Sequence, residues 1–159
     1  ADGAEMVRQT GCAGVVVGRG CLGRPWLFAD LVDAFTGGNH RVLPTLHEVS
    51  DVMFRHGELI VDYFESEDRG CRDLRKHMAW YLKGFRVNSE LRRQFGMVGS
   101  LKELRSLLDQ LDDQPYPVEI GEKPRGRTSS GRPPTLPDGW LNDPDEMIHL
   151  DAEDMFSGG

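Results

Sequence analysis

The sequence is poor in cysteine and has no long apolar run. Its three cysteines, Cys12, Cys21 and Cys71, form no CxxC pair, which argues against a disulfide-stabilised fold and favours a reducing, cytoplasmic setting. No stretch approaches the length that crosses a bilayer, and the opening ADGAEMVRQTG has neither the basic nor the apolar region of a signal peptide. We therefore expect no membrane partner and no metal site.

Proline is scarce before residue 114 and frequent after it. Seven of the nine prolines lie in residues 114–159, together with nine Asp/Glu against four Lys/Arg. Most of the formal net charge of −7 belongs to this segment, so the acidity does not exclude a basic, nucleic-acid-binding face elsewhere. The segment is aperiodic, and residues 114–159 are predicted to form a disordered or loosely docked tail. Its apolar positions that could dock back are Trp140, Leu141, Met147 and Ile148.

Residues 1–43 have the pattern of an α–β–α unit. An amphipathic helix is predicted over residues 2–10, a short buried strand over the β-branched run 13–17, and a helix over 26–35 that starts after Pro25. One strand cannot make a sheet. We therefore expect this α/β unit to be the end-piece of a larger domain.

Residues 44–113 are predicted to be all-α. Capping boxes at Thr45–Glu48 and Ser100–Glu103 mark two helix starts. The apolar spacing predicts helices over 45–64, 68–84, 89–95 (with Ser89 as cap) and 100–111, and short loops favour an antiparallel four-helix bundle. The predicted core positions are Leu46, Val49, Met53, His56, Ile60, Tyr63, Leu74, Met78, Tyr81, Leu82, Phe85, Leu91, Phe95, Leu101, Leu104, Leu107, Leu108 and Leu111.

A cationic stripe with an embedded aromatic residue runs along the second of these helices. Its members are Arg69, Arg72, Lys76, Trp80 and Lys83, with Arg75 and Arg86 beside them. Their spacing places them on one face, and no acidic residue is expected to interrupt it. Cations suit RNA phosphates and an indole suits base stacking, so the stripe is a candidate RNA-binding face. The alternatives are a solvated cationic face, or a Trp80 that packs into the chain's own core.

The tripeptide Gly18-Arg19-Gly20 ends the predicted strand. Main-chain N–H groups freed between a parallel strand and a helix form a natural phosphate site, and glycines permit the unusual φ angles that such a site needs. The alternative is a tight turn with a surface arginine.

Taken together, these motifs resemble one family. GCAGVVVGRGCLGRPWLF resembles the closing strand and last helix of the barrel in the tRNA-dihydrouridine synthases, especially the bacterial B-type. RDLRKHMAWYLKGF, ELRRQF and SLKELRSLLDQLD resemble that family's C-terminal helical domain in the same order. The resemblance covers about residues 1–113. It implies the end of an FMN-binding TIM (β/α)₈ barrel followed by a helical tRNA-binding domain.

The activity that the resemblance implies is NADPH-dependent reduction of uridine to 5,6-dihydrouridine in tRNA. In that chemistry reduced flavin gives a hydride to C6, and a cysteine acid protonates C5. Gly18 and Arg19 fall on the flavin-phosphate motif with Gly20 adjacent. The positions in the tRNA-facing segment are Arg72, Arg75, Lys76, Trp80 and Lys83.

The family's catalytic cysteine lies in a Gly-Cys-Pro setting, which this sequence lacks. We therefore assign none of the three cysteines as the acid and expect it upstream of residue 1. The chain is then a C-terminal portion that is inactive alone. The alternatives are a stand-alone RNA-binding helical module, or part of another flavin-dependent barrel enzyme such as a dihydroorotate- or dihydropyrimidine-dehydrogenase relative.

Overall fold

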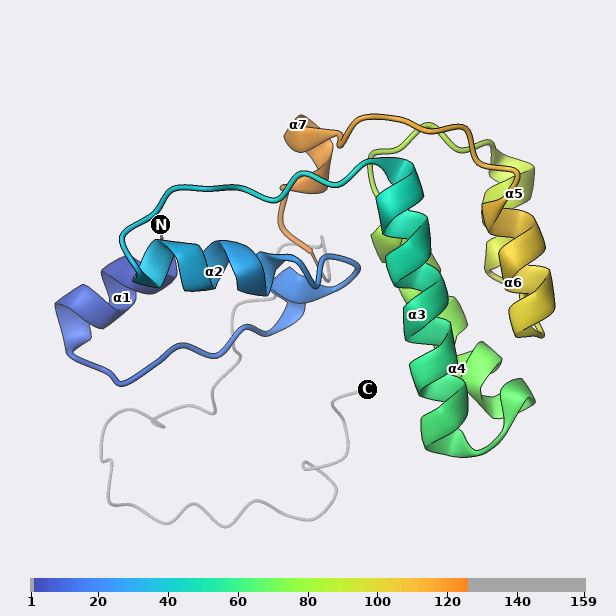
Figure 1. Cartoon of the computed structure of the whole chain (residues 1–159), viewed down its shortest axis with the longest axis horizontal. Helices are drawn as coiled ribbons and strands as arrows, with labels where there is room; N and C mark the ends of the chain where they lie inside the picture. The colour runs from blue at the N-terminus through green and yellow to red at the C-terminus, as the bar shows by residue number, and fades with distance from the viewer. Residues whose placement is uncertain (1, 126–159) are drawn as a thin grey trace, which may run out of the picture. The chain divides into compact units, whose positions relative to one another are not determined.

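The structure, a computed structural model, describes residues 2–125 (Figure 1). Within this range it contains helices and turns but no β-strand, and none of its helices is long and apolar enough to cross a bilayer. The elements are α1 (Asp2–Thr10), the 3₁₀ turn η1 (Arg19–Cys21), α2 (Leu27–Phe35), α3 (Leu46–Phe64), α4 (Glu67–Tyr81), α5 (Ser89–Phe95), α6 (Leu101–Leu108) and α7 (Val118–Gly121).

The strand predicted over residues 13–17 does not form. Val16 is 98% exposed, and the segment has no ladder partner among the described residues. A strand is stabilised by its neighbours in a sheet, so a β-branched run alone does not adopt one. The two flanking helices were predicted correctly, and α1 packs against α2. The predicted α/β end-piece of a TIM barrel is therefore not observed among the described residues, where only its two helices form.

Helix starts in the all-α region follow local capping signals. The Thr45 hydroxyl accepts the Glu48 N–H, and the Thr45 N–H donates to the Glu48 carboxylate at 2.7 Å, as the capping box predicts. At α6, Ser100 accepts the Glu103 N–H, but the Glu103 carboxylate takes the Gly99 N–H instead. The cap of α5 is Asn88, whose side chain accepts the Leu91 N–H at 2.8 Å. The prediction of Ser89 as the cap was wrong by one residue.

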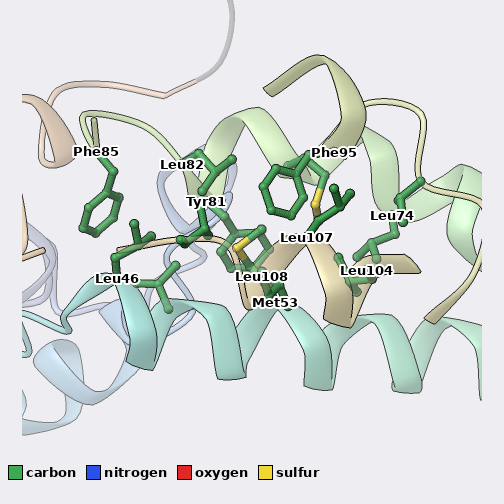
Figure 2. Close-up of a cluster of buried hydrophobic side chains, with 14 of the residues drawn as sticks. Leu46, Met53, Leu74, Tyr81, Leu82, Phe85, Phe95, Leu104, Leu107 and Leu108 are labelled. Atoms are coloured by element: carbon green, nitrogen blue, oxygen red, sulfur yellow. The ribbon is translucent and has the colours of Figure 1, made fainter. Parts of the chain in front are cut away.

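The core lies between α3, α4 and the two short helices that follow them. Figure 2 shows side chains from α3 (Leu46, Met53) and α6 (Leu104, Leu107, Leu108) converging with those of α4 and of Phe95. Helices α3 and α4 are joined by two residues and approach closely, since a Cβ on Gly70 would lie 2.7 Å from the Val61 Cα. A long helical hairpin completed by the short α5 and α6 is therefore observed.

Most predicted core positions are confirmed, with one clear exception. Tyr63 is 82% exposed, because it lies on the solvent side of the last turn of α3, whereas Val61 of the same turn meets α4. His56 and Ile60 are half-buried. Leu82 and Phe85 are buried as predicted, although α4 ends at Tyr81, before both of them.

The predicted tail is ordered over its first twelve residues. The Gln114 carbonyl accepts the Leu46 N–H, and the Gln114 side chain pairs with the backbone of Arg86. Tyr116 is buried and makes edge-to-face contacts with Trp26 and Phe85 at centroid distances of 6.0 and 6.1 Å. Residues 114–125 thus pack against the preceding helices through tertiary contacts, although the segment is weakly apolar. The rest of the predicted tail, with Trp140, Leu141, Met147 and Ile148, lies outside the described residues.

One guanidinium joins three segments. Arg125 donates to the carbonyls of Leu22, Trp80 and Gly121 at 2.8, 2.6 and 2.8 Å. Beside this clamp, Gly23 has φ +59°, and a Cβ there would lie 2.3 Å from the Trp80 carbonyl carbon. The turn that follows η1 is therefore seated on the C-terminal end of α4.

Gly23→Ala should destabilise the protein far more than Gly11→Ala. Both glycines have a left-handed φ, +59° and +69°, but a Cβ on Gly11 would meet no atom within 4 Å. Gly11→Ala should reduce the free energy of unfolding by about 1 kcal/mol, the cost of the left-handed conformation. Gly23→Ala adds a backbone clash and should cost about 2–4 kcal/mol. Urea unfolding followed by tryptophan fluorescence measures both, and equal losses would contradict the close seating of this turn.

Candidate nucleic-acid interface and adjoining cavity

The first ten residues of α4, 67–76, here called its cationic half, present exposed cations to solvent. Ser66 caps this helix by accepting the Arg69 N–H, and Arg69, Arg72 and Lys76 then lie on its exposed side. The Arg69 guanidinium sits 5.1 Å from the centre of the Phe64 ring, a cation–π contact that leaves its outer edge in water. Sequence spacing therefore located this part of the stripe correctly.

Acidic partners accompany two of these cations, contrary to the prediction of an uninterrupted stripe. Arg72 pairs with Asp68 at 3.0 Å, and Lys76 pairs with Asp73, whose carboxyl pKa is lowered by that hydrogen bond. The Arg72 and Lys76 side chains remain 66% and 71% exposed. Because exposed ion pairs contribute about 0–1 kcal/mol, a phosphate can displace these carboxylates.

The remaining stripe residues are engaged within the protein. Arg75 is half-buried and donates from Nε to the Val98 carbonyl at 2.8 Å. Lys83 donates to the carbonyls of Lys123 and Pro124 at 3.1 and 2.8 Å, and desolvation together with nearby Arg125 lowers its pKa. Trp80 is half-buried, and its carbonyl is one of the Arg125 acceptors. The stripe thus divides into exposed cations, Arg69, Arg72 and Lys76, and residues that hold the fold, Arg75, Trp80 and Lys83.

The Gly18-Arg19-Gly20 turn is exposed throughout. Neither glycine has the positive φ that was expected of it; Gly18 has φ −80°. A Cβ on Gly18 would meet nothing within 4 Å, and one on Gly20 would meet only the Val17 and Leu27 side chains, at 3.7 and 3.8 Å, so the turn is open on most sides. These three residues by themselves do not enclose a phosphate.

The cysteines occupy packing positions. Cys71 is fully buried, and burial, with Glu67 nearby, raises the pKa of its thiol. Cys12 and Cys21 are half-buried, and the Cys21 thiol donates to the Gly18 carbonyl at 3.1 Å. Across residues 2–125 no group of three or more potential metal ligands is found.

A cavity of about 590 Å³ opens between the turn after η1 and the helices α3 and α4. Three rings from two helices meet in its wall. The Tyr81 hydroxyl lies 3.0 Å from His56 Nδ1, and the His56 and His77 ring centres are 4.8 Å apart. Phe28 and Leu59 supply the apolar part of the wall, with Arg55 also lining it.

The three rings are uncharged near neutral pH. Burial lowers the pKa of His56, and His77 lowers it further, although Asp73 acts in the opposite direction. Burial likewise lowers the pKa of His77 against the effect of Asp73, and burial raises the pKa of Tyr81 to about 12. The cluster therefore offers neutral hydrogen-bonding groups inside a mainly apolar wall.

Sequence reasoning missed this cluster. It placed His56 and Tyr81 among core positions and did not single out His77. The fourth-residue spacing of His77 and Tyr81 does put both on one side of α4. Their meeting with His56 depends on how α3 packs against α4, which no local pattern encodes.

Comparison with known proteins identifies the family. Residues 1–116 match the family model described as dihydrouridine synthase (Dus). The chain is 52% identical over 161 residues to a probable tRNA-dihydrouridine synthase of Mycobacterium leprae, covering 99% of this chain and 41% of that protein. The probable tRNA-dihydrouridine synthase of Mycobacterium tuberculosis gives the same identity over 160 residues and the same coverage.

A more distant match is also to a tRNA-dihydrouridine synthase. The tRNA-dihydrouridine synthase B of Pasteurella multocida is 34% identical over 98 residues, covering 62% of this chain and 29% of that protein. The chain spans about two fifths of the length of its mycobacterial relatives. The match over residues 1–116 includes the cationic half of α4 and the cavity beside it. The chain therefore belongs to the dihydrouridine synthase (Dus) family.

Proposed function

We propose that this chain binds tRNA for dihydrouridine synthesis through the exposed cations of α4. The observation that carries the proposal is that Arg69, Arg72 and Lys76 lie together in solvent on one helix face, in a chain that matches tRNA-dihydrouridine synthases over residues 1–116. Guanidinium and ammonium groups in this arrangement bind the phosphate backbone without requiring a particular base sequence.

The carboxylates paired with Arg72 and Lys76 are compatible with RNA binding. Asp68 and Asp73 orient Arg72 and Lys76 while no RNA is present, and both carboxylates are themselves accessible to solvent. A phosphate replaces each carboxylate in a charge-assisted hydrogen bond of the same kind. Arg75, Trp80 and Lys83 support the face from behind, since their contacts fix α4 against residues 98 and 121–125.

In the proposed overall reaction, the C5=C6 bond of a tRNA uridine is reduced with electrons that come from NADPH through FMN. FMN would supply the hydride chemistry when bound. Gly18, Arg19 and Gly20 would contact its phosphate only together with other residues, because alone they form an open turn. We assign no catalytic residue to this chain.

Arg72→Ala/Lys76→Ala should weaken tRNA binding and flatten its salt dependence. Removing two phosphate contacts should reduce the slope of log K against log salt concentration by about 1.4–1.8. The matched control is Arg93→Ala/Lys102→Ala, which removes the same charge from exposed positions on α5 and α6. Arg93 is also ion-paired, with Glu90, as Arg72 is with Asp68.

Fluorescence anisotropy with labelled tRNA at several salt concentrations measures both variants. The control should keep the wild-type slope, because its cations lie on other helices. Equal loss in the two double variants would mean that binding follows net charge alone and that α4 is not the RNA face.

The chain alone should not bind FMN with measurable affinity. The turn at residues 18–20 offers one arginine and no enclosing wall. Titrating FMN with the purified chain should therefore leave the flavin fluorescence unquenched, and Arg19→Ala should behave like the wild type. Saturable quenching that Arg19→Ala abolishes would show that this turn is a complete phosphate site.

A further inference from the structure

We propose that the cavity between the Leu22 turn, α3 and α4 binds one unpaired base of the RNA whose backbone lies on the cationic half of α4. This inference rests on the proposed function and adds a second kind of contact to it. Phosphate binding on the cationic face does not by itself imply a base-binding cavity.

The shape and lining of the cavity suit a flat heterocycle. Its volume of about 590 Å³ lies within the range of small-ligand sites. Phe28 and Leu59 line it and are each 50% exposed, so they leave apolar surface in water that a base can cover. A base has apolar faces and a polar edge, which matches a wall that combines these side chains with His56, His77 and Tyr81.

The polar groups of the wall favour an uncharged ligand edge. Because burial lowers the pKa of both histidines, neutral imidazoles face the cavity, and each offers a hydrogen-bond donor and an acceptor. Tyr81 occupies Nδ1 of His56, which leaves Nε2 of His56 and the His77 ring for a ligand. Among the described residues that line it, the cavity holds no buried cation that would bind a phosphate group. The free imidazole nitrogens can instead pair with the hydrogen-bond donors and acceptors on the edge of a base.

The cavity adjoins cationic side chains of both helices. The Lys76 ammonium pairs with Asp73, which lies one turn before His77 on the same side of α4 and acts electrostatically on the pKa of both histidines. A phosphate bound at Lys76 would therefore lie near the histidine wall of the cavity. Arg55 lines the cavity from α3, and its ion pair with Glu58 at 3.1 Å is exposed on both sides. Cations thus lie beside a neutral, aromatic interior, which is the pattern of single-stranded nucleic-acid sites.

The test compares Leu59→Asp with Tyr63→Asp. Both positions lie on α3 one turn apart, both side chains are exposed, and both variants add one negative charge. Leu59 lines the cavity and Tyr63 does not. With a labelled single strand of ten uridines as the probe, Leu59→Asp should weaken binding by about tenfold or more, the loss of one stacked base. Tyr63→Asp should change it by less than about threefold, and the salt slope should stay the same in both.

A second measurement needs no variant. In the wild-type chain, the ring signals of His56 and His77 should shift when the oligouridine is added, while those of His47, an exposed residue at the start of α3, should not.

Equal effects of the two Asp variants, with His56 and His77 signals that do not move, would overturn the base site. If the salt slope still depends on Arg72 and Lys76, the proposed function survives that result and a protein segment becomes the better occupant of the cavity. If the wild-type chain binds neither tRNA nor oligouridine, the proposed function fails, and the base site fails with it.

Discussion

A half-buried guanidinium joins three segments that lie far apart in the sequence. Arg125 satisfies the carbonyls of Leu22, Trp80 and Gly121, so the turn after η1, the end of α4 and the segment after α6 share one hydrogen-bonded junction. Without Arg125 these part-buried carbonyls would lose a charge-assisted hydrogen bond, and a buried acceptor left without a partner costs about 1–3 kcal/mol. Gly23 makes the junction possible, because any side chain there would collide with the backbone of α4.

This junction divides α4 into two halves with different roles. At its C-terminal end, the Trp80 carbonyl and the Lys83 ammonium are used to hold residues 121–125. At its N-terminal end, Arg72 and Lys76 keep exchangeable partners in solvent. The same junction fixes the Leu22 turn opposite α3 and so forms the cavity beside the cationic face. A basic helix and a neutral aromatic cavity are thereby held next to one another, because Arg125 binds the carbonyl of Trp80 in α4 and that of Leu22 in the cavity wall.

Local sequence signals predicted the helices well and the tertiary features poorly. Capping at Thr45 and the leucine spacing of α6 are set by residues within one or two turns, so they can be recognised without a structure. The run at residues 13–17 has strand propensity but no sheet to join among the described residues, and Tyr63 follows the core spacing onto a side of α3 that stays exposed. Local information fails in both cases because burial depends on distant segments.

In the candidate site, too, local features could be predicted from the sequence and tertiary contacts could not. The exposed half of the stripe was predictable from helical spacing, and the pairing of Arg72 with Asp68 follows from the same spacing. The anchoring of residues 114–125 was not predictable, since it depends on Tyr116 meeting Trp26 and on Arg125 reaching Leu22. The cluster of His56, His77 and Tyr81 likewise exists only because α3 and α4 pack at one register.

The central claim is that RNA lies along the cationic half of α4 and reaches the cavity beside it. Ultraviolet crosslinking of tRNA to the wild-type chain, followed by mass spectrometry of the attached peptides, tests this claim directly. The account predicts crosslinks within residues 67–83 and within residues 51–59 of α3. Crosslinks confined to α1, α5 or α6 would contradict it.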